Sequence, residues 1–198
     1  LKVAPEHCAP NTLAYMGKPP IETFNKFKDK FYELSKKAGK KQYLVPYLMS
    51  SHPGSTLKDA VYLAEYLYKN HMRPEQVQDF YPTPGTISTA MYYTGLDPYT
   101  MQEVYIPRDP KEKEMQRALL QYYKKENKQI VAKALIRAGR RDLIGYGKEC
   151  LITPDGLALQ QDRKGAVKNG KNSSSKAKTY QRQGNKSGGR SKMQKKKH

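Results

Sequence analysis

Apolar positions in residues 1–90 form three short continuous runs, each followed by a stripe with helical spacing. The runs lie at Leu1–Ala4, Tyr43–Met49 and Gln76–Tyr81, and each predicts a β-strand. Tyr43–Met49 is too short to cross a membrane and is typical of a strand buried on both faces. Strand-to-helix units repeating about every 30 to 40 residues predict parallel strands joined by right-handed helical crossovers.

Capping residues and apolar spacing predict the helices that follow these strands. Asn11 or Thr12 can cap a short helix that ends at Met16. Thr56 and Asp59 have the spacing of a capping box and predict a helix to about Asn70. Between them lies a longer helix whose apolar residues recur every three or four positions and predict a face in the core: Ile21, Phe24, Phe27, Phe31 and Leu34.

Residues 91–153 have a different pattern. The tyrosine-rich segment 91–108 shows no clear period and predicts an ordered loop packed on the core, with base stacking as the alternative use of its aromatic rings. Asp109 and Pro110 then predict the start of a helix, and a second helix is expected at about Asn127–Ala138. We expect this helical pair to pack against the sheet.

Positive charge is concentrated at the end of the chain. Of the formal net charge of +19, residues 160–198 carry +12, from 13 Lys and Arg against one Asp. Lys, Gly, Ser, Asn and Gln dominate this segment, so it cannot bury enough apolar surface to offset its chain entropy, and we expect a disordered tail. Such a tail is either solvated or a sequence-independent contact with nucleic-acid phosphates.

The remaining composition narrows the class of protein. There is no apolar stretch of membrane-spanning length and no apolar leader, so we expect no membrane association. Cys8 and Cys150 lie far apart and form no disulfide framework, which indicates a cytoplasmic protein. The chain starts at Leu1 within a predicted strand, so we expect it to be part of a longer polypeptide.

Polar residues follow the predicted strands at their carboxyl ends, where parallel α/β folds bind ligands. Glu6 and His7 follow the first strand, and Ser51 and His52 follow the second. These side chains either bind a ligand or only hydrogen-bond the loop backbone. A third interpretation is a zinc site formed by His7, His52 and Cys8, although their spacing matches no known cage.

Five segments, in this order and spacing, resemble the YgiQ family of radical SAM proteins over roughly residues 1–153. They are KVAPEH (Lys2–His7), YLVPYLMSSHPG (Tyr43–Gly54), VQDFYPTP (Val77–Pro84), MYYTGLDP (Met91–Pro98) and MQRALLQY (Met115–Tyr122). The resemblance implies an α/β fold: the later half of a radical SAM partial TIM barrel, made of three parallel βα units. It divides the chain into a barrel half at 1–90, a family-specific helical extension at 91–153 and a disordered basic tail at 154–198.

The resemblance also implies a cofactor and a reaction. Radical SAM proteins hold a [4Fe-4S] cluster and S-adenosylmethionine, whose reductive cleavage gives a 5′-deoxyadenosyl radical that abstracts a substrate hydrogen. They ligate the cluster with a Cys-x3-Cys-x2-Cys loop, which this chain lacks. The chain alone is therefore expected to be inactive, and its implied partner is the missing N-terminal half of the barrel.

Three strand ends carry the cofactor residues that the resemblance implies. Pro5-Glu6-His7 resembles the end that approaches the ribose or amino acid moiety. Ser51-His52-Pro53-Gly54-Ser55-Thr56 resembles a Gly-x-Pro-Gly-Glu-Thr turn near the adenine, with Ser51 in place of Gly and Ser55 in place of Glu. Pro82-Thr83-Pro84-Gly85-Thr86 resembles a turn at the adenine edge. The predicted cofactor-binding residues are Glu6, His7, Ser50, Ser51, His52, Gly54, Pro82 and Gly85.

The alternative function is a non-catalytic module that binds RNA or the ribosome through the basic tail. The two functions are also compatible, because the tail could bring an RNA-modifying enzyme to its substrate. The basic residues selected for nucleic-acid contact are Arg163, Lys164, Arg182, Arg190, Lys195, Lys196 and Lys197.

Overall fold

A computed structural model describes residues 1–157 of the chain. Of the predicted disordered tail at 154–198, residues 154–157 are described, and the carbonyl oxygens of Asp155 and Gly156 accept from Lys128 and Gln129. Residues 158–198, with the seven nucleic-acid residues selected there, lie outside the described part. Residues 1–157 belong to one compact unit, so segments on both sides of residue 90 pack together.

The three predicted strands form one parallel sheet, which confirms the α/β class. They are β1 (Lys2–Glu6), β2 (Val45–Ser50) and β3 (Val77–Asp79), in the order β1-β2-β3. Each strand is shorter than or shifted from its apolar run, since pairing rather than hydropathy sets the ends of a strand.

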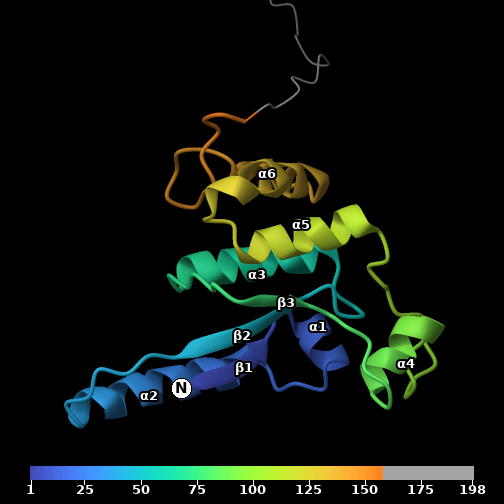
Figure 1. The fold of residues 1–198 in the computed structure, drawn as a ribbon, viewed down its shortest axis with the longest axis horizontal. Helices are drawn as coiled ribbons and strands as arrows, with labels where there is room; N and C mark the ends of the chain where they lie inside the picture. Colours follow the sequence, from blue (N-terminus) through green and yellow to red (C-terminus); the bar gives the residue numbers. More distant parts are fainter. Residues whose placement is uncertain (158–198) are drawn as a thin grey trace, which may run out of the picture. The chain divides into compact units, whose positions relative to one another are not determined.

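Six α-helices accompany the sheet in the described residues (Figure 1). They are α1 (Pro10–Tyr15), α2 (Ile21–Lys37), α3 (Leu57–Lys69), α4 (Ile87–Thr94), α5 (Pro110–Leu120) and α6 (Lys128–Arg137). The helix α4 extends to Thr94, into the segment predicted as a loop, and ends at Gly95 in the left-handed conformation with φ of 72°.

Side chains account for where several helices begin. The hydroxyl of Thr56 accepts the N–H of Asp59, while the Asp59 carboxylate accepts the N–H of Thr56, so the predicted capping box is confirmed. The Asp109 carboxylate accepts the N–H of Lys111 at the start of α5, as its N-cap position predicts. The helix α1 differs from the prediction: it begins at Pro10 after Ala9, which provides no side-chain cap.

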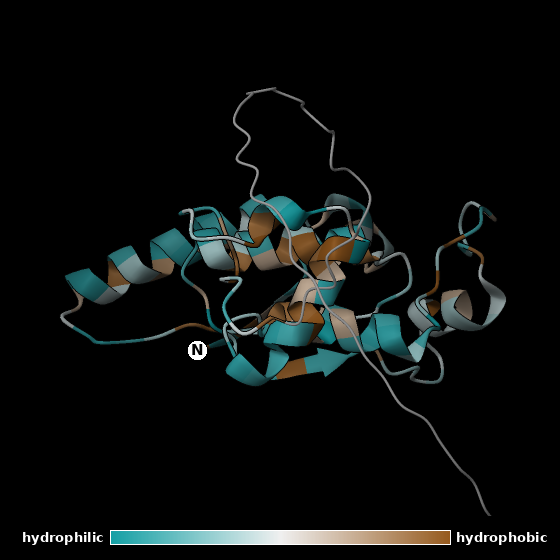
Figure 2. Cartoon of the chain, turned by 90° about the horizontal axis from the view of Figure 1, so that it is seen from above, coloured by the Kyte–Doolittle hydropathy of each residue, from teal (hydrophilic) through white to brown (hydrophobic). Residues whose placement is uncertain are grey.

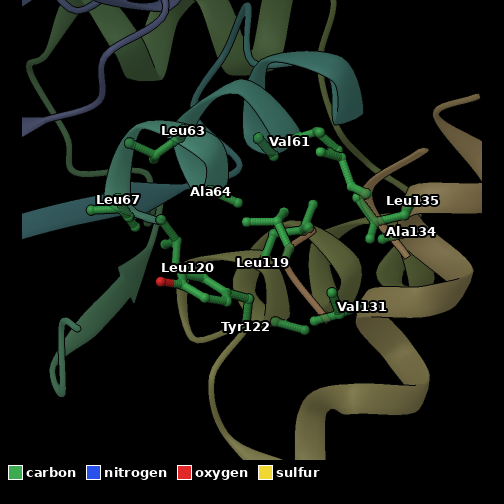
Figure 3. Close-up of a cluster of buried hydrophobic side chains, with 14 of the residues drawn as sticks. Val61, Leu63, Ala64, Leu67, Leu119, Leu120, Tyr122, Val131, Ala134 and Leu135 are labelled. Atoms are coloured by element: carbon green, nitrogen blue, oxygen red, sulfur yellow. The ribbon is translucent and has the colours of Figure 1, made fainter. Parts of the chain in front are cut away.

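The hydrophobic core lies among α3, α5 and α6. Figure 3 shows Leu119 of α5 surrounded by side chains such as Val61, Ala64 and Leu135 from the other two helices. The helix α5 also contacts β2 and β3, so it lies between the sheet and α6 (Figure 1). The predicted helical extension therefore supplies much of the core that supports the sheet.

The predicted core role of the α2 stripe is wrong for the described residues. Phe27 is 43% exposed and Leu34 51% exposed, while Ile21, Phe24 and Phe31 are only partly buried. In Figure 2 the helix α2 extends to the left and is largely hydrophilic in colour, with single hydrophobic residues. Helical spacing identifies a face that can be buried but does not supply the partner that would bury it.

The two faces of the sheet have different environments. Leu48 pairs with Val77, and both side chains pack on the helical core. Alternation places Tyr47 and Met49 on the opposite face, where both are only partly buried, and Gln78 beside Met49 is exposed. The prediction that this strand is buried on both faces is therefore wrong in this chain.

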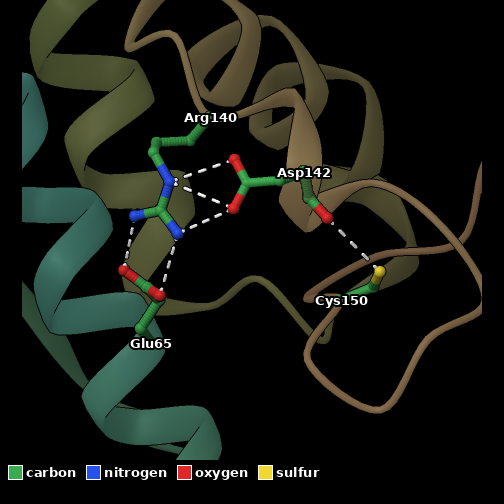
Figure 4. Close-up of polar contacts among 4 residues, drawn as sticks. All are labelled: Glu65, Arg140, Asp142 and Cys150. Carbon is green, nitrogen blue, oxygen red and sulfur yellow. Dashed lines mark hydrogen bonds and ion pairs between the residues drawn. The ribbon is translucent and has the colours of Figure 1, made fainter.

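Polar contacts fix the segment after α6 to α3 (Figure 4). The guanidinium of Arg140 donates to both carboxylate oxygens of Glu65, at 2.8 and 3.1 Å, and also binds Asp142. The Cys150 thiol lies 3.5 Å from the carbonyl oxygen of Asp142. This segment thereby closes one end of the core, where Leu143, Leu151 and Ile152 are buried.

None of the helices in residues 1–157 combines the length and hydropathy needed to cross a bilayer.

Candidate functional site

Two polar residues, Glu6 and His7, follow each other at the carboxyl end of β1. Glu6 has a φ of 63°, unusual for a residue other than glycine, and its carboxylate pairs with Lys18 at 3.2 Å. His7 is buried, and its Nδ1 accepts the N–H of Ala9 at 3.0 Å. Burial lowers the pKa of His7 to about 4, so its imidazole is neutral at pH 7.

The end of β2 contains a hydroxyl that has no partner within residues 1–157. Ser51 is 1% exposed and has a φ of 62°, and its Oγ makes no hydrogen bond. The neighbouring Ser50 is satisfied, because its hydroxyl donates to the Asp79 carboxylate at the end of β3. Buried hydroxyls are nearly always paired, and in the described residues the Oγ1 of Thr12 is the other exception. What distinguishes Ser51 is its position at the carboxyl end of the central strand, where parallel sheets bind ligands.

His52 connects the second and third strand ends. Its Nε2 lies 2.8 Å from the Ser88 hydroxyl in α4, and its Nδ1 lies 2.7 Å from the Pro53 carbonyl oxygen. Burial lowers the pKa of His52, against the hydrogen bond to Pro53 and the nearby carboxylate of Glu6, which both raise it. Because β1 and β2 are neighbouring parallel strands, with Glu6 paired to Leu48, their carboxyl ends lie side by side at one edge of the sheet.

Gly54 allows a close approach between the turn and α1. It has a φ of 84°, and a Cβ atom placed there would lie 2.1 Å from the ring of Tyr15. Its N–H donates to the Tyr105 carbonyl oxygen at 2.7 Å. No other residue fits this position without moving Tyr15.

The third strand end is more open. Pro82 is partly buried, Gly85 is exposed with a φ of 81°, and Thr86 caps α4. Ser88 and Phe80 join this region to the second strand end: the Ser88 hydroxyl contacts His52, and the Phe80 N–H donates to the Ser50 carbonyl oxygen at 2.8 Å. The structure thus brings Glu6, His7, Ser50, Ser51, His52 and Gly54 to one end of β1 and β2, while Pro82 and Gly85 lie at the end of β3.

A buried amide that the sequence analysis missed supports this site. Gln116 of α5 is fully buried, and its Oε1 accepts the N–H of Ser51 at 3.0 Å and the hydroxyl of Ser55 at 3.2 Å. Glu112, one turn earlier, is also buried and accepts from Gln116 Nε2. The signal for both was available: two polar residues four positions apart interrupt the apolar face of α5.

The zinc interpretation finds no support in residues 1–157, where no group of three or more His, Cys, Asp and Glu side chains could hold a metal ion. Cys8 and Cys150 are both free. Burial raises the pKa of the Cys8 thiol to about 12, so it is protonated at neutral pH and a poor nucleophile.

The fold and these residues define a class: an α/β protein with a parallel sheet and a polar site at the carboxyl ends of its strands. The chain belongs to the UPF0313 family, also named the YgiQ family, and residues 75–198 match its C-terminal domain, described as "Domain of unknown function (DUF3362)". This confirms the resemblance found in the sequence. No solved structure matches the chain.

Curated relatives named UPF0313 protein match about three quarters of the chain. This chain is 62% identical to UPF0313 protein CPE1196 of Clostridium perfringens over 152 residues. The aligned residues cover 77% of this chain and 23% of the relative. This chain is 58% identical to a UPF0313 protein of Methanocella arvoryzae over 154 residues. The aligned residues cover 78% of this chain and 26% of the relative. The chain thus spans about a quarter of the length of these relatives.

Proposed function

We propose that this chain is part of a radical SAM enzyme and supplies one side of its S-adenosylmethionine pocket. The single observation that carries the proposal is the buried, unpartnered hydroxyl of Ser51 at the carboxyl end of the central strand. Parallel α/β folds bind ligands at this end of the sheet, and a ligand oxygen or nitrogen would satisfy the hydroxyl.

The sheet supports the finer proposal of a partial TIM barrel. One face of β2 packs on helices, whereas the other carries the partly buried Tyr47 and Met49 and lies beside the exposed Gln78. A barrel wall has this asymmetry, with helices outside and a second layer of side chains or ligand inside. The missing N-terminal half of the barrel is the partner that would complete the inner face.

The residues present fit part of the cofactor. Glu6 offers a partly exposed carboxylate for an ammonium or ribose hydroxyl group, and Ser51 offers a free hydroxyl. His52 is held by Ser88 and Pro53, so its role is to shape the turn. The backbone at Pro82 and Gly85 would meet the adenine edge.

The residues present do not fit the [4Fe-4S] cluster, because two separate cysteines cannot replace a three-cysteine loop. S-adenosylmethionine, when bound and reduced in a complete enzyme, supplies a radical that abstracts hydrogen from the substrate. The contribution of this chain would be to bind and orient the cofactor and to exclude water from it.

The test compares a full-length family member with this chain after anaerobic reconstitution with iron and sulfide. Production of 5′-deoxyadenosine from S-adenosylmethionine and a reductant by the full-length protein alone is the expected result. We expect Ser51→Ala and Glu6→Ala to weaken cofactor binding about tenfold each, the loss of one hydrogen bond or ion pair. A folded, cluster-loaded protein that does not cleave the cofactor would refute the proposal.

The second candidate is binding of RNA or the ribosome by the basic tail. The observation that favours it is the net charge of +12 on residues 160–198, against +7 on the rest of the chain. Deleting residues 160–198 separates the two functions, because cofactor cleavage would persist while nucleic-acid binding would be lost.

A further inference from the structure

The buried amide of Gln116 joins the helix α5 to the turn after β2 through both of its ends. Oε1 accepts the N–H of Ser51 and the hydroxyl of Ser55, and Nε2 donates to the carbonyl oxygen of Ser55 at 2.9 Å. Nε2 also donates to Glu112, so the oxygen of the amide has two donors as partners and the nitrogen has two acceptors. These partners fix the orientation of the amide.

A second layer of contacts fixes Gln116 itself. Glu112 Oε1 accepts from Gln116 Nε2 at 3.3 Å and from the Tyr105 hydroxyl at 2.6 Å. Arg137 of α6 lies 3.6 Å from the other oxygen of Glu112. Tyr105 and Arg137, both within the DUF3362 match, therefore hold the Glu112 carboxylate, and Glu112 in turn accepts from the amide that binds the Ser51 turn.

This arrangement maintains an unfavourable backbone conformation. A residue with a side chain at the φ of Ser51 costs about 1–2 kcal/mol, and it persists only where surrounding contacts hold it. The hydrogen bond from the Ser51 N–H to Gln116 is such a contact, since it would be lost in the ordinary strand conformation. The Gly54 N–H, bound to the Tyr105 carbonyl oxygen, anchors the same turn at a second point.

We propose that Gln116 is a positioning residue: the DUF3362 domain uses it to hold Ser51 so that the Ser51 hydroxyl stays free for S-adenosylmethionine. This inference rests on the proposed function and gives the helix α5 of the domain a role in the cofactor pocket. Gln116 does not touch the cofactor in this proposal, because it is fully buried and all of its polar contacts are to protein.

The variant that tests the proposal is Gln116→Met, which keeps the volume and removes the hydrogen bonds. Leu119→Ala is the matched control, because Leu119 is buried on the same helix and packs in the apolar core instead of the turn. Hydrogen exchange is measured on this chain. We expect Gln116→Met to raise exchange at the Ser51 amide about tenfold more than Leu119→Ala does at matched global stability.

A second variant separates a specific hydrogen bond from general loosening. Gln116→Glu keeps an acceptor for the Ser51 N–H but loses both donor contacts, to the Ser55 carbonyl oxygen and to the Glu112 carboxylate. Both Gln116 variants are therefore compared in a Glu112→Gln background, so that no second buried carboxylate faces residue 116. We expect slower exchange at the Ser51 amide in Gln116→Glu than in Gln116→Met. Equal exchange at Ser51 in both variants would overturn the inference.

Cofactor affinity is then measured by equilibrium dialysis in a full-length family member that carries the same substitutions. We expect Gln116→Met to raise the Kd for S-adenosylmethionine about tenfold and Leu119→Ala to leave it within about twofold. Binding by the unsubstituted protein with an unchanged Kd in Gln116→Met overturns this inference alone. Absence of binding by the unsubstituted protein overturns the proposed function and this inference with it.

Discussion

Ser51 combines two unfavourable features at one residue, a positive φ and a buried hydroxyl without a partner. Each costs stability, and neither serves the fold. The sequence contained half of this information, because the resembling turn has Gly where this chain has Ser51, and Gly is the residue that positive φ favours. The free hydroxyl could not be predicted, since it depends on every neighbour that does not bind it.

A comparison of two variants tests the strain at Ser51. We expect Ser51→Gly to be more stable than Ser51→Ala by about 1 kcal/mol, because both remove the hydroxyl but only glycine relieves the positive φ. Urea unfolding of the two variants measures the difference. If Ser51→Ala is the more stable variant, the conformation at residue 51 is not strained.

The buried imidazole of His7 gives the second prediction. The pKa of His7 is lowered to about 4 in the folded chain by burial, against 6.5 for the unfolded chain. Between pH 6.5 and pH 4 the imidazole of His7 is protonated in the unfolded chain but not in the folded chain. The free energy of unfolding therefore falls as the pH falls from 6.5 towards 4. We expect a loss of about 2 kcal/mol between pH 7 and pH 5 from this residue.

Urea unfolding at the two pH values measures this loss, and His7→Asn is the control. The Asn side chain can still accept the N–H of Ala9 and does not titrate. His52, whose pKa is also lowered by burial, is present in both proteins, so the difference between their pH profiles gives the contribution of His7 together with its interaction with His52. The same pH dependence in His7→Asn would show that His7 is not the residue responsible.

At the scale of elements, features that depend on neighbouring residues were predicted better than features that depend on residues far apart in the sequence. The capping box at Thr56 and the cap at Asp109 depend on residues within three positions, and both were predicted. The burial of α2 depends on what packs against it, and the sequence pattern alone gave the wrong result. The same limit hid Gln116, whose partners lie 61 and 65 residues away.

The contrast between α2 and α5 predicts unequal costs for the same substitution. Leu119 is fully buried among three helices, so Leu119→Ala should cost about 3 kcal/mol in free energy of unfolding. Leu34 is 51% exposed, so Leu34→Ala should cost less than about 1 kcal/mol in this chain. Equal losses in thermal or urea unfolding would mean that the stripe of α2 is buried after all.

At the scale of the whole molecule, the predicted barrel half and the predicted extension depend on each other. The helix α5 packs on α3 and on the strands β2 and β3, and its Arg117 pairs with Asp79 at the end of β3. The order of strands and helices could be predicted from the sequence because each unit is local. That the helical pair packs on the sheet was also predicted, and α5 contacts β2 and β3, whereas α6 packs on α5 and α3. Which surfaces meet could not be predicted, because no pattern in residues 91–153 specifies the surface that they cover.

The last prediction concerns residues 158–198 and rests on their sequence. If about six of the tail cations contact phosphates, the logarithm of the RNA affinity should fall with the logarithm of salt concentration at a slope of roughly −5. Replacing Lys195, Lys196 and Lys197 with Gln should bring the slope closer to zero by about 2 to 3.

The matched control replaces Lys36, Lys40 and Lys41, which are exposed and lie in the described part of the chain. Both triple variants lose the same net charge, so a long-range effect of charge alone would change the two slopes equally. Phosphate contacts made by the tail would change only the first, because counterion release counts the cations that meet phosphates. Equal slopes in fluorescence titrations would therefore remove the tail as an RNA-binding segment, and the cofactor pocket would stand as the only proposed function.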